Sequence, residues 1–239
     1  MHPSDIKGNS IYIATCLLPK KHIQDYLSAA IKMLPHMMQE EINRYHKVKD
    51  RMLRVMSRLM IAYLIEDYLK KGRDILLNWQ KDTFGRPFIK GLPIDISISH
   101  SEPWVAVAVA LNGRIGIDIE VYRNVDVDIF ANYLTWDEIK QIKSSPIPSH
   151  EAIKRWSVRE AILKADGRGL LVSDDVIRNA KGLLSPCGRP WCIKQILFSK
   201  ACLYLAHEDP HSSLRLLPLD INELVNPSLI TSYHNKAIL

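Results

Sequence analysis

The sequence predicts a mixed α+β fold, and three observations lead to this prediction. Residues 94–121 are typical of short strands, because isoleucine alternates with other residues on either side of a Val-Ala run. Residues 39–71 and 150–166 instead have helical spacing of their apolar side chains and end at glycine. After residue 170 the pattern returns to short β segments, and we expect strands at 192–199, 201–206 and 214–217.

Length and composition indicate a globular chain with a basic balance. At 239 residues and 47% hydrophobic, it can form one large domain or two lobes. Its apolar runs are shorter than the roughly 20 residues of a membrane span, and its first ten residues lack the apolar region of a secretory signal. We therefore expect a cytoplasmic protein with no membrane partner. The net charge of +6 implies an anionic partner, which is a nucleic acid, a phosphorylated small molecule or an acidic protein.

The four cysteines form no CxxC pair, so we expect reduced thiols and no zinc site. The letters His207-Glu208-Asp209-Pro210-His211 match the zinc-protease pattern HExxH. Pro210 breaks the helix that this pattern needs, which argues against a metalloprotease.

The first elements in order are a strand and a basic helix. Residues 11–17 are predicted to form the strand, and the helix over 39–71 has a wide apolar stripe and stops at Gly72. Cations also recur along it at intervals of three and four, namely Arg44, Lys47, Arg51, Arg54 and Arg58. Neighbouring like charges cost a few tenths of a kcal/mol per pair, which favours binding of a polyanion, although a solvated basic face is the alternative. Lys49 lies off this row, where it could reach another part of the same ligand.

Residues 76–79 are predicted to form a short strand that leads into a turn. The turn spans 80–87 and carries Lys81 and Arg86, the latter directly after Gly85. It therefore delivers positive charge to a defined place.

Residues 94–121 are the most informative stretch of the chain. The first strand brings the polar side chains Ser99, His100 and Ser101 to its end, and the run 104–111 is predicted to be a strand buried on both sides. Asn112-Gly113 tolerates the positive φ of a type I′ turn, so we predict a hairpin with the return strand at 114–121.

The return strand places two carboxylates on one face. Asp118 and Glu120 are two residues apart and share this face with Gly116. Two acids so close are stable at neutral pH mainly with a cation between them, and oxygen ligands favour Mg²⁺ or Mn²⁺. The alternative is an exposed strand face that happens to carry two acids.

A second group of candidate residues lies on the later helix. Thr135 and Glu138 form a capping box that opens a short helix ending near residue 143. In the helix over 150–166, Trp156, Glu160 and Lys164 are four apart and share one face. A Glu-Lys pair at this spacing is most often a surface stabiliser, but a tryptophan on the same face argues against full exposure.

Four motifs in this order resemble the phosphopantetheinyl transferases of the large, single-chain surfactin type. They are the glycine turn with its basic residue, the strand ending in Ser-His-Ser, the GIDIE strand, and the helix WSVREAILK followed by GRGL. The resemblance is close over 81–170 and looser over 45–64. It implies two similar α+β lobes related by pseudo-twofold symmetry, at residues 1–113 and 114–239, with the active site in the cleft between them.

The resemblance also implies an activity. Such enzymes, called holo-acyl-carrier-protein synthases, move 4′-phosphopantetheine from coenzyme A to a serine of an acyl or peptidyl carrier protein and release adenosine 3′,5′-bisphosphate. The expected partners are thus coenzyme A and the carrier, without nucleic acid, and a monomer is expected.

Site residues follow from the resemblance position by position. Asp118, Glu120 and Glu160 match the magnesium ligands, and Glu160 also matches the general base for the carrier serine, directly or through water. Lys164 would contact the diphosphate and stabilise the leaving phosphate. The expected coenzyme A contacts also include Lys49, Arg51, Lys81, Arg86, Ser99 and His100, and His100 is counted with the catalytic residues.

Two positions depart from the family pattern, and two other functions stay open. Arg86 and Arg159 stand where the family usually has lysine; both keep the charge, and the bulkier Arg159 neighbours the base. The same acids and lysine could serve a metal-dependent nuclease or phosphodiesterase. The five-cation helix could instead belong to a nucleic-acid-binding module, although few aromatic residues accompany it.

Overall fold

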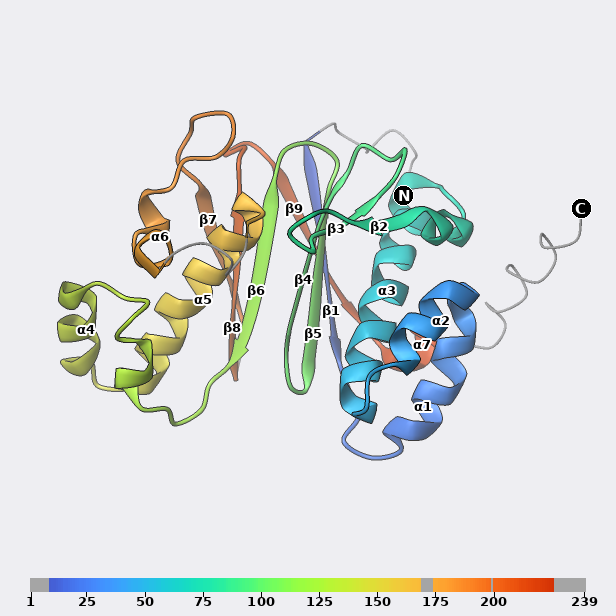
Figure 1. The fold of residues 1–239 in the computed structure, drawn as a ribbon, viewed down its shortest axis with the longest axis horizontal. Coiled ribbons are helices and arrows are strands. Elements are labelled where there is room, and N and C mark those ends of the chain that lie inside the picture. The colour runs from blue at the N-terminus through green and yellow to red at the C-terminus, as the bar shows by residue number, and fades with distance from the viewer. Residues whose placement is uncertain (1–8, 169–173, 199, 226–239) are drawn as a thin grey trace, which may run out of the picture.

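The computed structural model describes residues 9–168, 174–198 and 200–225, and in them a mixed α+β fold. A four-stranded sheet has the order β4-β5-β1-β9 and a three-stranded sheet the order β6-β8-β7. Helices α1, α2, α3 and α7 lie on the side of the first sheet, and α4, α5 and α6 on the side of the second (Figure 1). The predicted α+β class is confirmed, whereas the pseudo-twofold symmetry stays a prediction.

The strands mostly follow the predicted segments. The first sheet contains β1 (Ser10–Leu17), β4 (Asp95–Ser101), β5 (Trp104–Ala110) and β9 (Ser213–Leu219), and the second contains β6 (Ile115–Val121), β7 (Cys192–Leu197) and β8 (Ala201–His207). Within the second predicted lobe, β9 is the exception, because it pairs in parallel with β1 of the first sheet. The lobe boundary between residues 113 and 114 stays a prediction, and β9 from the second predicted lobe pairs with a strand of the first.

The two sheets pack face to face through a core of small and branched side chains. Ile11 and Ile13 of β1 meet Ile117 of β6 and Leu203 of β8 in this layer, together with alanines of β5. The other face of β1 and β5 packs against α3 (Val48–Leu69). The run in β5 is therefore buried on both sides, as predicted.

The predicted hairpin between residues 104–111 and 114–121 is wrong. The chain does bend at Asn112-Gly113, but of these two residues only Gly113 has a positive φ (76°), so the bend is not the predicted type I′ turn. However, β5 already pairs with β4 on one edge and with β1 on the other, while β6 pairs with β8. Both edges of β5 are taken, so β6 crosses to the second sheet.

Side chains of β4 bind the edge of β6. These two strands are neighbours that share no backbone ladder. Instead, the amides of Ile115, Ile117, Ile119 and Val121 donate in turn to Asp95 Oδ2 (2.7 Å), Ser97 Oγ (2.9 Å), Ser99 Oγ (3.2 Å) and Ser101 Oγ (3.0 Å). We call this row of contacts the seam. It satisfies edge amides that would otherwise be unpaired and joins the two sheets.

The helices depart from prediction mainly in the first half. The expected helix over 39–71 is two helices, α2 (His36–Asn43) and α3, because Lys47 adopts an extended backbone at the start of α3. Residues 76–79, predicted as a strand, mostly belong to a 3-10 helix (Arg73–Asn78) that precedes the short hairpin β2 (Trp79–Lys81) and β3 (Pro87–Ile89). The shorter N-terminal helix α1 spans Ile23–Ala30, with a 3-10 turn at Ile31–Met33.

The later helices agree with the sequence patterns. The Thr135 capping box opens α4 (Trp136–Lys143), and α5 (Pro148–Asp166) ends at Gly167, whose φ is 98°. Gly169 and Leu170 of the GRGL segment lie outside the described residues. Short helical segments complete the fold at Val127–Phe130, α6 (Asp174–Arg178), Ala180–Gly182 and α7 (Ile221–Leu224).

Among the described residues, the zinc-protease letters form no metal-binding helix and the cysteines form no disulfide. The HExxH letters span the end of β8 and a loop, so they form no helix, and all four cysteines are free thiols. Among the described helices, none is long and apolar enough to cross a membrane.

Candidate active site

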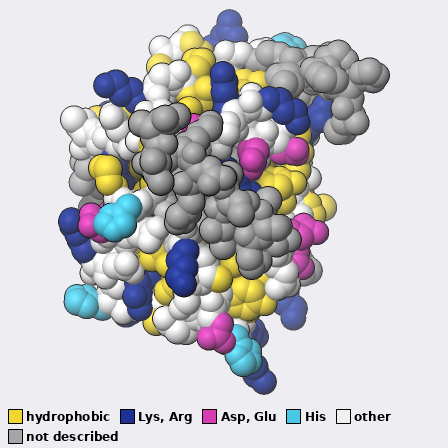
Figure 2. All heavy atoms as spheres, turned by 90° about the vertical axis from the view of Figure 1, so that its right-hand side faces the viewer, with side chains coloured by type: hydrophobic (Ala, Val, Ile, Leu, Met, Phe, Trp, Pro, Cys, Tyr) yellow, Lys and Arg dark blue, Asp and Glu magenta, His cyan; other side chains and the backbone are white. Residues whose placement is uncertain are grey.

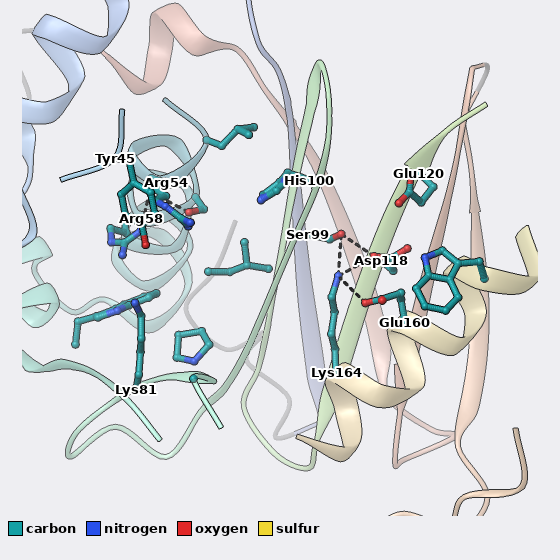
Figure 3. Close-up of a pocket in the computed structure, with 17 residues that line it drawn as sticks. Tyr45, Arg54, Arg58, Lys81, Ser99, His100, Asp118, Glu120, Glu160 and Lys164 are labelled. Carbon is teal, nitrogen blue, oxygen red and sulfur yellow. Dashed lines mark hydrogen bonds and ion pairs between the residues drawn. The ribbon is translucent and has the colours of Figure 1, made fainter. Parts of the chain in front are cut away.

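A cavity of about 500 Å³ collects most of the candidate residues. It is lined from α3, the β2–β3 hairpin, β4, β6 and α5, and thus from both predicted lobes (Figure 3). The lining residues are Tyr45, Leu53, Arg54, Ser57, Arg58, Trp79, Lys81, Gly85, Pro87, Ile98, Ser99, His100, Asp118, Glu120, Trp156, Glu160 and Lys164.

One end of the cavity holds the acids and Lys164. Gly116 allows this, because a Cβ at this position would lie 1.9 Å from the carbonyl oxygen of Ala161 on α5. The close approach of β6 to α5 brings Asp118 opposite Glu160. Between them, Lys164 Nζ lies 2.7 Å from Asp118 Oδ1 and 3.9 Å from Glu160 Oε2 (Figure 3).

Burial and neighbouring charges set the protonation of this end. Burial raises the pKa of Glu160, and the charges of Asp118 and Glu120 raise it further, while Lys164 opposes them. Burial also lowers the pKa of His100, and the positive charge of Lys164 acts in the same direction. Glu160 is therefore a better proton acceptor than an exposed glutamate, and His100 favours its neutral form.

The carboxylates have partners within the protein. Asp118 is 3% exposed, and its Oδ1 accepts from Ser99 Oγ (2.8 Å) as well as from Lys164. Glu120 Oε2 accepts from Ser101 Oγ (3.0 Å) and from Arg123 (2.8 Å). These neighbours offset the repulsion that the sequence pattern indicated.

The fit of the acid end to a divalent ion depends on its oxygen ligands. In the described part of the chain, no three His, Cys, Asp or Glu side chains form a group that could hold a metal. The donors nevertheless suit Mg²⁺ chemically, and Asp118 Oδ2 is buried without any hydrogen-bond partner. Asp118 therefore has one oxygen available to an ion, whereas Glu120 Oε2 is shared by Ser101 and Arg123.

The opposite end of the cavity is basic. The Arg54 guanidinium lies 3.8 Å from the centre of the Tyr45 ring, and Arg58 packs 5.3 Å from that of Trp79. Glu41, which does not line the cavity, forms ion pairs with both Arg58 (3.3 Å) and Lys81 (2.7 Å). The Nε atoms of Arg54 and Arg58 are buried without a hydrogen-bond partner, so this end has donor capacity for an anion.

Comparison with known proteins places the chain in a family. Residues 114–211 match the family described as the 4′-phosphopantetheinyl transferase superfamily, and residues 21–112 match the description "4′-phosphopantetheinyl transferase, N-terminal". The chain belongs to the 4′-phosphopantetheinyl transferase superfamily. The surfactin-type class predicted from the motifs is supported as well.

Similar proteins carry the same description. The 4′-phosphopantetheinyl transferase gsp of Aneurinibacillus migulanus is 29% identical over 64% of this chain and 62% of its own length. The 4′-phosphopantetheinyl transferase psf-1 of Bacillus pumilus is 26% identical over 53% of this chain and 55% of its own length. The 4′-phosphopantetheinyl transferase Sfp of Bacillus subtilis (strain 168) is 27% identical over 55% of this chain and 59% of its own length. The match thus spans between 55% and 62% of the length of these three relatives.

Within this superfamily member, the cations expected to contact phosphoadenosine lie in different places, and their contacts stay a prediction. Of the five-cation row, Arg54 and Arg58 line the cavity, while Arg44 and Lys47 precede α3. Lys49 pairs with Glu102 (2.5 Å), and neither Lys49 nor Arg51 lines this cavity. A signal was present in the sequence, because Arg54 and Arg58 interrupt the apolar run of residues 52–62, where a charge needs a partner.

Arg86 and Arg159 do not line this cavity, although Arg86 stands between its lining residues Gly85 and Pro87 and lines an adjoining cavity. Arg86 binds Asp95 of β4 and the carbonyl oxygens of Ile115 (2.7 Å) and Lys164. Arg159 is 1% exposed and binds Glu138 of α4. The other predicted residues, Lys81, Ser99, His100, Asp118, Glu120, Glu160 and Lys164, all line the cavity.

Proposed function

We propose that this protein transfers 4′-phosphopantetheine from coenzyme A to a serine of an acyl or peptidyl carrier protein and releases adenosine 3′,5′-bisphosphate. The observation that carries the proposal is one cavity with three cations at one end and three acids with a lysine at the other. The cations are Arg54, Arg58 and Lys81, and the opposite end holds Asp118, Glu120, Glu160 and Lys164. Coenzyme A has two separated anionic groups, a 3′-phosphate and a diphosphate, which match these two ends. Membership of the superfamily supports the same reading.

The residues of the acid end supply the groups that a phosphoryl transfer needs. The carrier serine oxygen attacks the phosphorus next to pantetheine, and the bond from that phosphorus to the bridging diphosphate oxygen breaks. Glu160 takes the serine proton, directly or through water, because burial raises its pKa and makes it a stronger base. Lys164 has a flexible ammonium with three donors and is 27% exposed, so it can follow the charge onto the leaving phosphate.

Asp118, Glu120 and Glu160 would hold Mg²⁺, or Mn²⁺ in its place. When bound, such an ion neutralises charge on the diphosphate. His100 lies between the two ends of the cavity, where its exposed ring can donate to a phosphate oxygen (Figure 3).

The test is a mass measurement on an apo carrier protein. The protein is incubated with coenzyme A, Mg²⁺ and a panel of fatty-acid, polyketide and peptide carriers, and a well-studied transferase runs in parallel. We expect a gain of one phosphopantetheine on at least one carrier, and a loss of this gain in Glu160→Gln. A panel that stays unmodified while the parallel enzyme works contradicts the proposal.

The same preparation addresses the alternatives from the sequence. Mg²⁺-dependent cleavage of nucleic acid that disappears in Asp118→Ala would support a phosphodiesterase. Salt-sensitive duplex binding that is unchanged in Glu160→Gln would support a binding module. On the described part of the face in Figure 2, Lys and Arg lie singly among other side chains and form no continuous basic track on that face. A monomeric state and a cytoplasmic location stay predictions.

A further inference from the structure

The seam between β4 and β6 repeats one geometry along the strands. At each step of two residues, a serine hydroxyl of β4 accepts the backbone N–H of a β6 residue, at Ser97, Ser99 and Ser101. Serine has one hydroxyl proton left to donate after accepting such a bond. Where that proton goes differs from one serine to the next.

At Ser99 and Ser101 the proton goes to a carboxylate of the candidate active site. Ser99 Oγ donates to Asp118 Oδ1 (2.8 Å) and Ser101 Oγ donates to Glu120 Oε2 (3.0 Å). Asp118 directly precedes Ile119, whose backbone N–H donates to Ser99 Oγ. In the same way, Glu120 directly precedes Val121, whose N–H donates to Ser101 Oγ. One hydroxyl thus fixes a carboxylate relative to its own backbone.

Ser99 uses its full hydrogen-bonding capacity in this way. Its hydroxyl donates to Asp118 and accepts from Ile119 N (3.2 Å) and Lys164 Nζ (3.0 Å). A hydroxyl has a single proton to donate, and Ser99 gives it to Asp118, so none remains for a phosphate oxygen. Because Asp118 Oδ1 is held by Ser99 and Lys164, the oxygen without a partner is Oδ2.

Ser97 provides a comparison within the same seam. It accepts from Ile117 N (2.9 Å), as the other two serines accept from their β6 partners, but the corresponding β6 residue is Gly116. Glycine has no side chain, so Ser97 has no carboxylate to hold at this step.

We propose that Ser99 and Ser101 are positioning residues that fix the Asp118 and Glu120 carboxylates for ion binding. This assigns Ser99 a role different from the phosphate contact expected from the family resemblance. The inference rests on the proposed function, since it concerns the same acids. Residues that orient metal ligands by hydrogen bonds commonly change metal affinity by roughly tenfold or more when they are removed.

The experiment measures Mn²⁺ binding to the full chain in the presence of coenzyme A, by electron paramagnetic resonance of the free ion. Ser99→Ala and Ser101→Ala are compared with Ser97→Ala, which removes the same seam contact and no carboxylate contact. We expect Ser99→Ala and Ser101→Ala to raise the Mn²⁺ dissociation constant roughly tenfold. Ser97→Ala should leave it unchanged within about twofold, because it orients no metal ligand. Melting temperatures should fall in all three variants and most in Ser99→Ala, which loses the largest number of hydrogen bonds.

Conservative variants protect the test against misfolding. Ser99→Thr and Ser101→Thr retain the hydroxyl and should keep Mn²⁺ binding close to that of the unchanged protein. The proposal is overturned if Ser97→Ala weakens binding as much as the other two, if neither of those weakens it, or if the unchanged protein binds no Mn²⁺. A protein that binds Mn²⁺ with this pattern and modifies no carrier contradicts the proposed function alone.

Discussion

At the residue scale, Arg54 and Arg51 both lie on α3, but we expect them to contribute differently to coenzyme A binding. The Nε atoms of both are buried without a hydrogen-bond partner, but Arg54 lines the cavity whereas Arg51 does not. Arg54→Ala should weaken coenzyme A binding by roughly tenfold or more, the usual cost of losing a hydrogen bond to a charged group. Arg51→Ala should leave it nearly unchanged. Isothermal titration with coenzyme A measures both, and a larger effect at Arg51 contradicts the placement.

At Gly116, the absence of a Cβ atom allows β6 to lie close to α5. In Gly116→Ala the new Cβ would lie 1.9 Å from Ala161 O and 2.4 Å from Ala165 N, so α5 must move away from β6. We expect a loss of about 1–3 kcal/mol in the free energy of unfolding, as for other overpacked sites. Transfer to the carrier should also fall by about 100-fold, because Glu160 and Lys164 move with α5.

Gly182 offers a matched control for that substitution. A Cβ there meets no atom within 4 Å, so Gly182→Ala should change neither stability nor transfer appreciably. Denaturant unfolding and the carrier mass measurement provide the two readouts. Equal behaviour of the two alanine variants would show that β6 and α5 tolerate separation.

At the scale of elements, Glu138 connects α4 to α5. Its Oε2 accepts from Thr135 at the start of α4, and the carboxylate binds Arg159 of α5 and Lys181 (3.1 Å). Burial alone would raise the pKa of Glu138, but the hydrogen bond from Arg159 and those from Thr135 and Lys181 outweigh it and lower this pKa to about 2. Arg159 therefore braces the helix that carries Glu160, rather than facing the cavity.

The depressed pKa gives a prediction for acid stability. Because the pKa of Glu138 is lower in the folded state than its ordinary value of 4.5, its contribution is full above pH 4.5 and is lost as the pH falls toward 2. This contribution is roughly 2–3 kcal/mol. Glu138→Gln should lower the free energy of unfolding at pH 7 and flatten its decline between pH 4.5 and 2. Asp137→Asn, an exposed neighbour in the same helical turn, should keep the decline.

Local signals account for the elements that the sequence predicted well. The Thr135 capping box, the α5 termination at Gly167 and the alternation in β4 and β6 each depend on residues close in sequence. The hairpin failed because the pairing of β5 with β1 and of β6 with β8 involves strands far apart in sequence. The acid end of the site was predictable from motifs, whereas the choice of Arg54 over Lys49 depends on how α3 faces the β2–β3 hairpin.

At the scale of the whole molecule, Arg86 connects parts of both sheets and α5. It binds Asp95 of β4 and the carbonyl oxygens of Ile115 on β6 and Lys164 on α5. Lysine has no planar fork and cannot make these contacts together. Arg86→Lys should therefore lower the melting temperature while the coenzyme A dissociation constant changes little.

This variant also separates two roles for Arg86. A phosphate contact, as the family resemblance implies, predicts weaker coenzyme A binding in Arg86→Ala and its partial retention in Arg86→Lys, with little change in melting. Thermal unfolding and titration on the same samples distinguish the two patterns. Lys81→Ala, which changes a cavity-lining cation of the same hairpin, should show the reverse pattern of weak binding with a nearly normal melting temperature.

The pairing of β1 with β9 has a consequence for how the chain is made. β1 is translated before the other described strands, but residues 213–219, which complete one of its two edges, are translated after all of them. Until then the nascent chain exposes an unpaired strand edge, which is the type of surface that recruits chaperones or promotes aggregation. Ribosomes that stall before Ser213 would therefore release a product with this edge permanently open.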